Sequence, residues 1–320
     1  MRRSDHDVCN DVKTTDADAV GMEVTHIYLS LYGMRGATVM RQAFEEIERL
    51  YQGGHPEFHP CDAGYHDIQH VLEVTLAMAR LMDGYERSRY NGTPPLPPEI
   101  FTLGIIAALF HDVGYLRRRN DRVHRYGAEY TLSHVSRGAH ILRSYLERLG
   151  MHKVAAIAGQ LLHFTGYERG VETIRLSDRL LRRLGEMLGS ADILAQMSDR
   201  CYFEKCRDRL YPEFVLGGLA RRRLPDGRVE AVYASGDDLV RSTPEFFKGA
   251  VHRLESTLGR AYKYCEVHFD GQDVYFEELR KNMRFADSVA RAPTRETLRR
   301  RPPWTLPPGV NPYPDSLANP

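Results

Sequence analysis

The sequence predicts an all-α protein, a bundle of helices with at most one small β-hairpin. Between residues 67 and 197, successive segments repeat apolar residues at the spacing of one helix face. The glycine signatures G-x-G-x-x-G, G-x-x-x-x-G-K and G-x-S-x-G are absent from the sequence, so the parallel-sheet nucleotide and hydrolase folds lack their usual mark. Only residues 222–235 alternate weakly as strands do, around a turn at Pro225 to Gly227. Helix therefore dominates the expected fold.

The expected elements follow in order along the chain. Residues 1–23 begin with a polar stretch and are expected to form a disordered tail. Residues 24–290 are expected to form one helical domain with a C-terminal helical extension. Its helices are expected as two pieces within 24–51, broken near 33–36, and then at 67–83, 99–112, 128–149, 153–164, within 175–197 as a pair, 243–264 and 274–290. The proline-rich residues 291–320 are expected to form a flexible tail or a surface-clasping arm.

Composition bounds the class of protein. The 320 residues are 42% hydrophobic and 27% charged, with a formal net charge of +1, so no overall charge favours a nucleic acid polymer or an anionic membrane as a partner. The five cysteines include no C-x-x-C pair, which disfavours a zinc knuckle and a redox disulfide. No segment resembles a signal peptide or a membrane span. We therefore expect a cytoplasmic protein, with no signal in the sequence for its oligomeric state.

One stretch carries the strongest sign of chemistry. Residues 103–115 read LGIIAALFHDVGY, so an apolar run delivers His111 and Asp112 side by side. Burying an imidazole beside a carboxylate costs several kcal/mol, as an order of magnitude, unless the two are paired or bound to a metal. The alternative is a helix that simply reaches the surface here, with both side chains in water.

Further histidines and an aspartate occupy similar apolar settings, one helix apart from each other. The full candidate set is His70, His111, Asp112, His134, His163 and Asp192. Taken singly, each could be an ordinary core or surface residue. Together, imidazoles and carboxylates suit divalent metal ions such as Mn, Mg, Fe, Ni or Zn, and a carboxylate can bridge two of them. We therefore expect a site for divalent metal ions, two in number.

The same residues carry a resemblance to a known family. His70, the pair His111-Asp112 and Asp192 look like the H…HD…D pattern of the HD-domain metal-dependent phosphohydrolase superfamily. YHDIQHVLEV, residues 65–74, is similar to the Y-H-N-x-x-H-x-x-D-V signature of the cyclic-nucleotide phosphodiesterases, with Asp67 and Glu73 in place of its Asn and Asp. The resemblance implies an HD-domain helical bundle in which His66 protonates the leaving group and His70 binds metal.

A second resemblance extends the ligand set. HVSRGAHIL is similar to the H-P-x-x-G-A-x-I-L stretch of HD-GYP proteins, and LLHFTGY aligns with their next histidine. It implies that His134 and His163 are further ligands. Glu168 stands where those proteins have the proline of G-Y-P, which disfavours a cyclic-di-nucleotide substrate. The two resemblances cover residues 65–192.

The expected function is a metal-dependent phosphohydrolase or phosphodiesterase that acts on a nucleotide or another small phosphate ester through a metal-bound hydroxide. His66 and Asp112 are the expected catalytic residues. Arg117, Arg118 and Tyr115 are the expected substrate-binding residues, since guanidinium groups suit phosphate, although an arginine run is equally typical of a solvated loop. Two alternatives remain open: an HD-fold di-iron oxygenase, whose H, HD, H, H, D ligand order also matches, and a non-catalytic metal-binding regulatory module.

Overall fold

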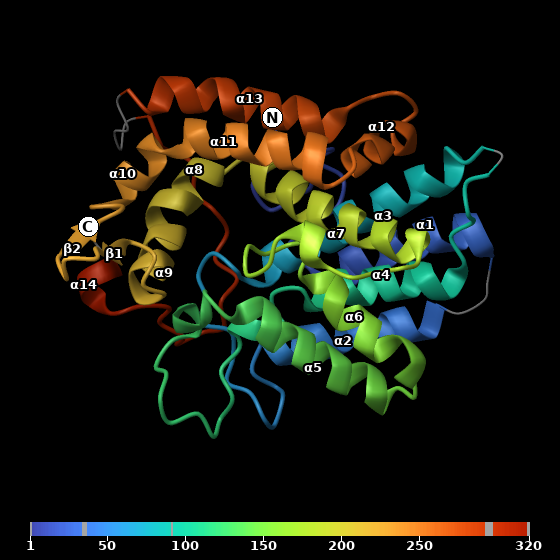
Figure 1. Ribbon diagram of the computed structural model, residues 1–320, viewed down its shortest axis with the longest axis horizontal. Helices are drawn as coiled ribbons and strands as arrows, with labels where there is room; N and C mark the ends of the chain where they lie inside the picture. Colours follow the sequence, from blue (N-terminus) through green and yellow to red (C-terminus); the bar gives the residue numbers. More distant parts are fainter. Residues whose placement is uncertain (1, 34–36, 91, 292–296, 319–320) are drawn as a thin grey trace.

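The computed structural model describes residues 2–33, 37–90, 92–291 and 297–318. Helix α4 (Pro98–Phe110) lies among the other helices, and all its residues from Phe101 onward are buried. A helix that is apolar on all sides needs cover on all sides. That cover comes from α2 (Ala37–Tyr51), α3 (Ile68–Arg87), α6 (His152–Leu162) and α7 (Arg179–Ser198). The prediction of an all-α fold is confirmed (Figure 1).

Two further helices complete the first half of the fold. Helix α1 (Ala17–Tyr32) packs on α2 and α3, and α5 (His134–Arg148) pairs with α6. The 3₁₀ turn η1 (Val113–Tyr115) continues from the end of α4 and lies against α5. Gly114 permits this contact, because a Cβ at that position would lie 1.8 Å from the carbonyl oxygen of His134. The backbone of the HD pair is thereby held against the first turn of α5.

The second half of the chain adds shorter elements. They are α8 (Tyr202–Lys205), the π-helical turn η4 (Cys206–Leu210), α9 (Tyr211–Leu216), strands β1 (Arg221–Arg223) and β2 (Val229–Ala231), α10 (Gly236–Arg241), α11 (Thr243–His252), the π-helical turn η5 (Arg253–Thr257), η6 (Ala261–Lys263), α12 (Tyr264–His268), α13 (Val274–Val289) and α14 (Asp315–Ala318). Helices α11 and α13 lie along one side of the molecule, and α13 packs on α7 (Figure 1).

The small hairpin is present where it was expected. Arg221 pairs with Ala231 and Arg223 with Val229 in an antiparallel register.

Several predicted helix boundaries were wrong. The helix expected from residue 128 starts at His134, because η2 (Gly127–Tyr130) forms a separate 3₁₀ turn. The segment 175–197 holds one helix that starts at Arg179, where Asp178 caps the N-terminus. The helix expected over 243–264 is divided into α11, η5, η6 and α12.

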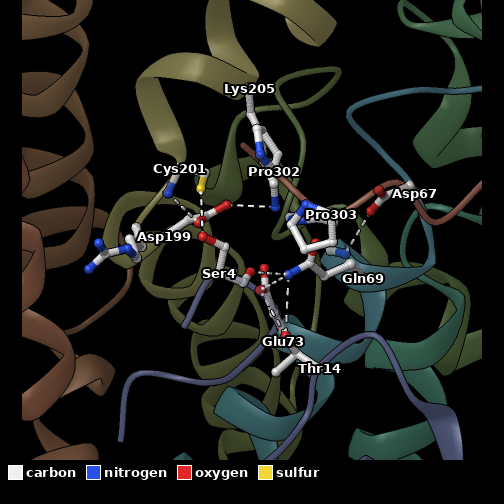
Figure 2. Close-up of polar contacts among 12 residues, drawn as sticks. Ser4, Thr14, Asp67, Gln69, Glu73, Asp199, Cys201, Lys205, Pro302 and Pro303 are labelled. Atoms are coloured by element: carbon white, nitrogen blue, oxygen red, sulfur yellow. Dashed lines mark hydrogen bonds and ion pairs between the residues drawn. The ribbon is translucent and has the colours of Figure 1, made fainter. Parts of the chain in front are cut away.

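The N-terminal segment differs from the expected disordered tail. Met1 lies outside the described residues, but residues 2–16 form turns and α1 begins at Ala17. Asp7 is buried and forms an ion pair of 2.5 Å with Arg80 of α3, and Thr14 donates to Glu73 of α3 at 3.1 Å. Figure 2 shows Thr14 beside Gln69 and Glu73. The polar residues of this segment, whose composition predicted disorder, instead pair with charged residues of α3.

The C-terminal residues 297–318 form a clasping arm, the second of the two expected arrangements. Leu298, Leu306 and Tyr313 are buried. Arg209, itself 5% exposed, donates to the carbonyl oxygens of Pro302 and Pro303, and the Thr305 hydroxyl donates to Asp67. The arm therefore lies on the segment that leads into α3. Residues 292–296, 319 and 320 of the expected tail lie outside the described part of the chain.

Among the described helices, none is both long enough and apolar enough to cross a membrane.

Candidate metal centre

Asp112 is the residue on which the predicted ligands converge. Helix α4 ends at Phe110, His111 follows as its C-cap, and Asp112 opens the η1 turn. His111 is 1% exposed and Asp112 3%, because the buried helix carries both side chains into the interior. The alternative of a helix that reaches the surface with both side chains in water is thereby excluded.

The distances around Asp112 define the cluster. Its Oδ2 lies 3.2 Å from Nε2 of His111 and 3.4 Å from Nε2 of His70, and its Oδ1 lies 3.6 Å from Nε2 of His134. Asp192 of α7 completes the group, with Oδ1 at 3.3 Å from Nε2 of His70. One ligand atom from each of His70, His111 and Asp112 falls within 4.8 Å of the others. Five of the six predicted ligands thus come from α3, the end of α4, α5 and α7 to one place.

Backbone carbonyls orient two of these imidazoles. Nδ1 of His111 lies 2.7 Å from the carbonyl oxygen of Ala108, and Nδ1 of His134 lies 2.7 Å from that of Thr131. A carbonyl oxygen only accepts, so each Nδ1 carries a proton and Nε2 is the ring nitrogen that faces the cluster. Metal-ligating histidines are commonly held in this way.

Nε2 of His111 lies close to two other electron-rich atoms. Nε2 of His111 lies 3.3 Å from Nε2 of His70 as well as 3.2 Å from the Asp112 carboxylate. Two acceptors at this distance repel each other unless a proton or a metal ion lies between them. The donor set of imidazoles and carboxylates fits a divalent ion. The site therefore requires positive charge at its centre.

The shifted pKa values of the cluster also indicate that positive charge is stabilised at its centre. Burial disfavours the charged form of His70, but hydrogen bonds with Asp112 and Asp192 outweigh it and raise the pKa of His70 to about 10. Burial likewise opposes ionisation of Asp112, yet His111, His66 and His70 hold the pKa of Asp112 well below its usual range. Without metal, the carboxylates thus keep a proton on His70, in the place where a cation is needed.

His66 stands beside this cluster and has a partner that the sequence did not reveal. Its Nδ1 lies 2.5 Å from Oε2 of Glu213 in α9, and Oε1 of Glu213 accepts from the backbone N–H of Tyr65 at 2.6 Å. Burial lowers the pKa of His66, but the charges of Glu213 and Asp112 outweigh it, so the pKa is raised overall. No local signal marks Glu213, which is 147 residues from His66.

Tyr115 joins His66 to the metal ligands. Its ring stacks on His66 with centroids 4.3 Å apart and on His134 with centroids 4.5 Å apart. Of the three residues predicted to bind substrate, Tyr115 is the one that contacts the cluster.

The other two, Arg117 and Arg118, form ion pairs with acidic residues outside the cluster. Arg117 pairs with Asp62 at 3.1 Å and Arg118 with Glu57 at 2.9 Å, because the link after η1 runs beside residues 57–59.

His163 is the predicted ligand that does not join the others. It follows the end of α6, is 6% exposed, and its buried Nδ1 has no hydrogen-bond partner among the described residues. Burial and then the charge of Arg169 lower its pKa. The neighbouring backbone nevertheless approaches the cluster from two sides. Gly166 packs against Val135, next to His134, and Phe164 packs against Gly189, one turn before Asp192.

Comparison with known families supports this grouping. Residues 67–202 match the family described as HD domain, a range that contains all six predicted metal ligands and ends before Glu213. Comparison with curated proteins and with solved structures gave no significant match.

Proposed function

We propose that this chain, whose residues 67–202 match the HD-domain family, is a metal-dependent phosphohydrolase that acts on a phosphate ester of a nucleotide or another small molecule. His70, His111, Asp112 and Asp192 would hold a first divalent ion, and His134 with the second oxygen of Asp112 would contribute to a second. Bound ions would polarise a phosphoryl oxygen and make a water molecule acidic enough to attack at neutral pH. We place the enzyme in the cytoplasm, since its free cysteines suit a reducing compartment.

The orientation of His111 and His134 carries this proposal. Both rings present Nε2 to Asp112, because both Nδ1 atoms donate to backbone carbonyls. Nε2 is therefore the atom that either ring offers beside the carboxylate, and imidazole nitrogens beside a carboxylate are a donor set that a metal ion stabilises.

His66 is the proposed general acid. Glu213 accepts from Nδ1–H, so a protonated His66 keeps its second proton on Nε2 for the leaving oxygen. The raised pKa of His66 favours that protonated form near neutral pH. The stacked ring of Tyr115 fixes the plane of the imidazole. Glu213 is therefore a positioning residue that acts through His66.

The test measures release of 4-nitrophenol from 4-nitrophenyl phosphate and bis(4-nitrophenyl) phosphate. The protein is first treated with a chelator and then supplied with Mn²⁺, Mg²⁺, Fe²⁺, Ni²⁺ or Zn²⁺. We expect metal-dependent turnover that His134→Ala abolishes. His140→Ala is the matched control, because His140 is an exposed histidine on the same helix. Equal turnover by the two folded variants, or no turnover on either ester, contradicts the proposal.

A further inference from the structure

A cavity lies beside His163, outside the cluster around Asp112. It has a volume of about 260 Å³ and is lined by Gln160, His163, Arg169, Thr173, Ile174 and Arg175. A single water needs only about 10–15 Å³ of such space. The cavity is bounded by the end of α6 and by the segment that contains η3 (Val171–Thr173). It is therefore large enough for a small polar group of a ligand.

The lining of this cavity is rich in hydrogen-bond donors. Two guanidinium groups, an imidazole, an amide and a hydroxyl surround it, and no carboxylate of the described residues lines it. Of the two nearest acidic residues in the sequence, Glu168 accepts from the backbone N–H groups of Val135 and Ser136, and the exposed Glu172 lies against Gly170. The lining itself therefore carries two guanidinium charges and no carboxylate.

Four arginines surround this segment, and they divide into two kinds. Arg182 donates to the carbonyl oxygen of Ile174, and Arg253 donates to those of Phe164 and Gly166, so these two hold the backbone in place. Arg169 and Arg175 make no hydrogen bond or ion pair within the described part of the chain, and both are exposed. The two free guanidinium groups are those that line the cavity. A structural role does not account for them.

The side chain of His163 adds an observation that points to a ligand. The residue is only 6% exposed, and its Nδ1 lacks a partner among the described residues. A buried polar nitrogen without a partner is costly. A ligand oxygen in the cavity would lie beside this imidazole and would accept bidentate contacts from the arginines.

The segment that bounds the cavity also packs on the two helices that carry His134 and Asp192. The residues that follow His163 touch α5 beside His134 and α7 one turn before Asp192. We propose that this cavity is an anion subsite that binds a second phosphate or carboxylate group of the substrate, remote from the phosphoryl group that is cleaved. As a substrate subsite it rests on the proposed phosphohydrolase function, and it assigns the substrate to the class of small molecules with two anionic groups.

Binding is tested without catalysis. Inorganic phosphate is titrated by calorimetry into the full chain after removal of metal. We expect binding that the double variant Arg169→Ala/Arg175→Ala weakens by at least about tenfold, since two charge-assisted contacts are lost. Arg284→Ala is the matched control, an exposed arginine on α13, which lies away from α6 in Figure 1. Absence of phosphate binding, or equal binding by the double variant, overturns the subsite.

Turnover then identifies the source of the anion. Alkanediol bisphosphates of increasing length are compared with the corresponding alkyl monophosphates in a phosphate-release assay. A substrate subsite predicts a preferred bisphosphate length whose KM rises about tenfold in the double variant, with monophosphate turnover unchanged. An equal effect on both substrates overturns the assignment.

The two experiments together separate the subsite from the proposed function. If the wild type binds phosphate through the arginines but hydrolyses no ester, the anion site stands and the proposed function fails. If hydrolysis depends on Asp112 but phosphate binding is indifferent to the arginines, the proposed function stands and the anion subsite fails.

Discussion

Glu213 holds His66 from a distance of 147 residues in sequence, with Oε2 at 2.5 Å from Nδ1. The carboxylate is 1% exposed and also accepts from the backbone N–H of Tyr65. Both the ring and the chain that carries it are therefore fixed by one side chain of α9. This relationship connects the C-terminal half of the protein, beyond the HD-domain match, to the chemistry proposed for the first half.

Replacement of Glu213 by Gln tests that connection. The charge of Glu213 raises the pKa of His66, so its loss lowers that pKa. A general acid acts in its protonated form, and the basic limb of the pH profile of kcat/KM is expected to move to lower pH. We expect the rate at pH 7.5 to fall about tenfold to a hundredfold, part of the roughly 10²–10⁴ that general acid catalysis supplies. An unmoved basic limb would show that Glu213 does not act through His66.

Tyr115 offers a test of the stacked rings. Tyr115→Phe preserves the stacking on His66 and His134 and removes only the hydroxyl, which hydrogen-bonds with Thr131. We expect its turnover within about tenfold of wild type, as expected for a lost neutral hydrogen bond of about 0.5–1.5 kcal/mol. Tyr115→Ala leaves a cavity, and we expect a loss of about 3–5 kcal/mol in the free energy of unfolding together with a larger loss of turnover. Denaturant unfolding and steady-state kinetics check the pair, and equal kinetics for the two variants would exclude a positioning role for the ring.

The buried ion pair between Asp7 and Arg80 tests the order of the N-terminal segment. Asp7→Asn leaves the buried guanidinium without its charge partner, and we expect a loss of about 3–5 kcal/mol in the free energy of unfolding. Asp11→Asn is the control, since Asp11 is exposed. Equal stability of the two variants at pH 7 would mean that this segment is not packed as described.

The same ion pair gives the stability a defined pH dependence. Burial opposes ionisation of Asp7, but Arg80 outweighs it and lowers the pKa. The stabilisation is therefore present above the ordinary pKa of 3.8 and is lost as the pH falls through the lower value of the folded state. Denaturant unfolding of wild type and Asp7→Asn across this acidic range is expected to show the difference between them shrinking as the pH falls.

Metal identity separates hydrolase from oxygenase chemistry. We expect Mn²⁺ or Mg²⁺ to restore phosphate release to the chelated protein, and Fe²⁺ under air to consume no more O₂ with the protein than in buffer alone. An oxygen electrode and a phosphate assay on the same samples measure both. Bound ion is also expected to stabilise the fold, by about 2.7 kcal/mol at a hundredfold excess over Kd. Iron-dependent uptake of O₂ without phosphate release would favour the di-iron oxygenase instead.

The residues that gather around Asp112 could be predicted where they have a local signal. His111 and Asp112 end an apolar helix, His70 lies on an apolar stripe, and Asp192 is flanked by buried residues of α7. The all-α fold follows from the same periodicity. The same local signals do not predict contacts between residues that are far apart in the sequence.

Pairings across the fold could not be predicted from local pattern. Glu213 belongs to a six-residue helix with no motif, and only the tertiary fold brings it to His66. Arg117 and Arg118 have the right chemistry for phosphate and the right position after the motif, and local pattern did not reveal that they pair with Asp62 and Glu57. The polar N-terminus looked disordered because its buried partners, Arg80 and Glu73, lie on another element.

Proton release on metal binding tests the central assignment most directly. At pH 7.5 the metal-free site holds a proton on His70, whose pKa is about 10, and an incoming ion must displace it. Calorimetric titration of Mn²⁺ in buffers of different ionisation enthalpy counts that proton. We predict release of about one proton for the ion that binds His70, in the wild type and in His140→Ala, and greatly weakened binding in Asp112→Ala. Mn²⁺ binding that is undiminished in Asp112→Ala, or that releases no proton from the wild type, would contradict a metal centre at these residues.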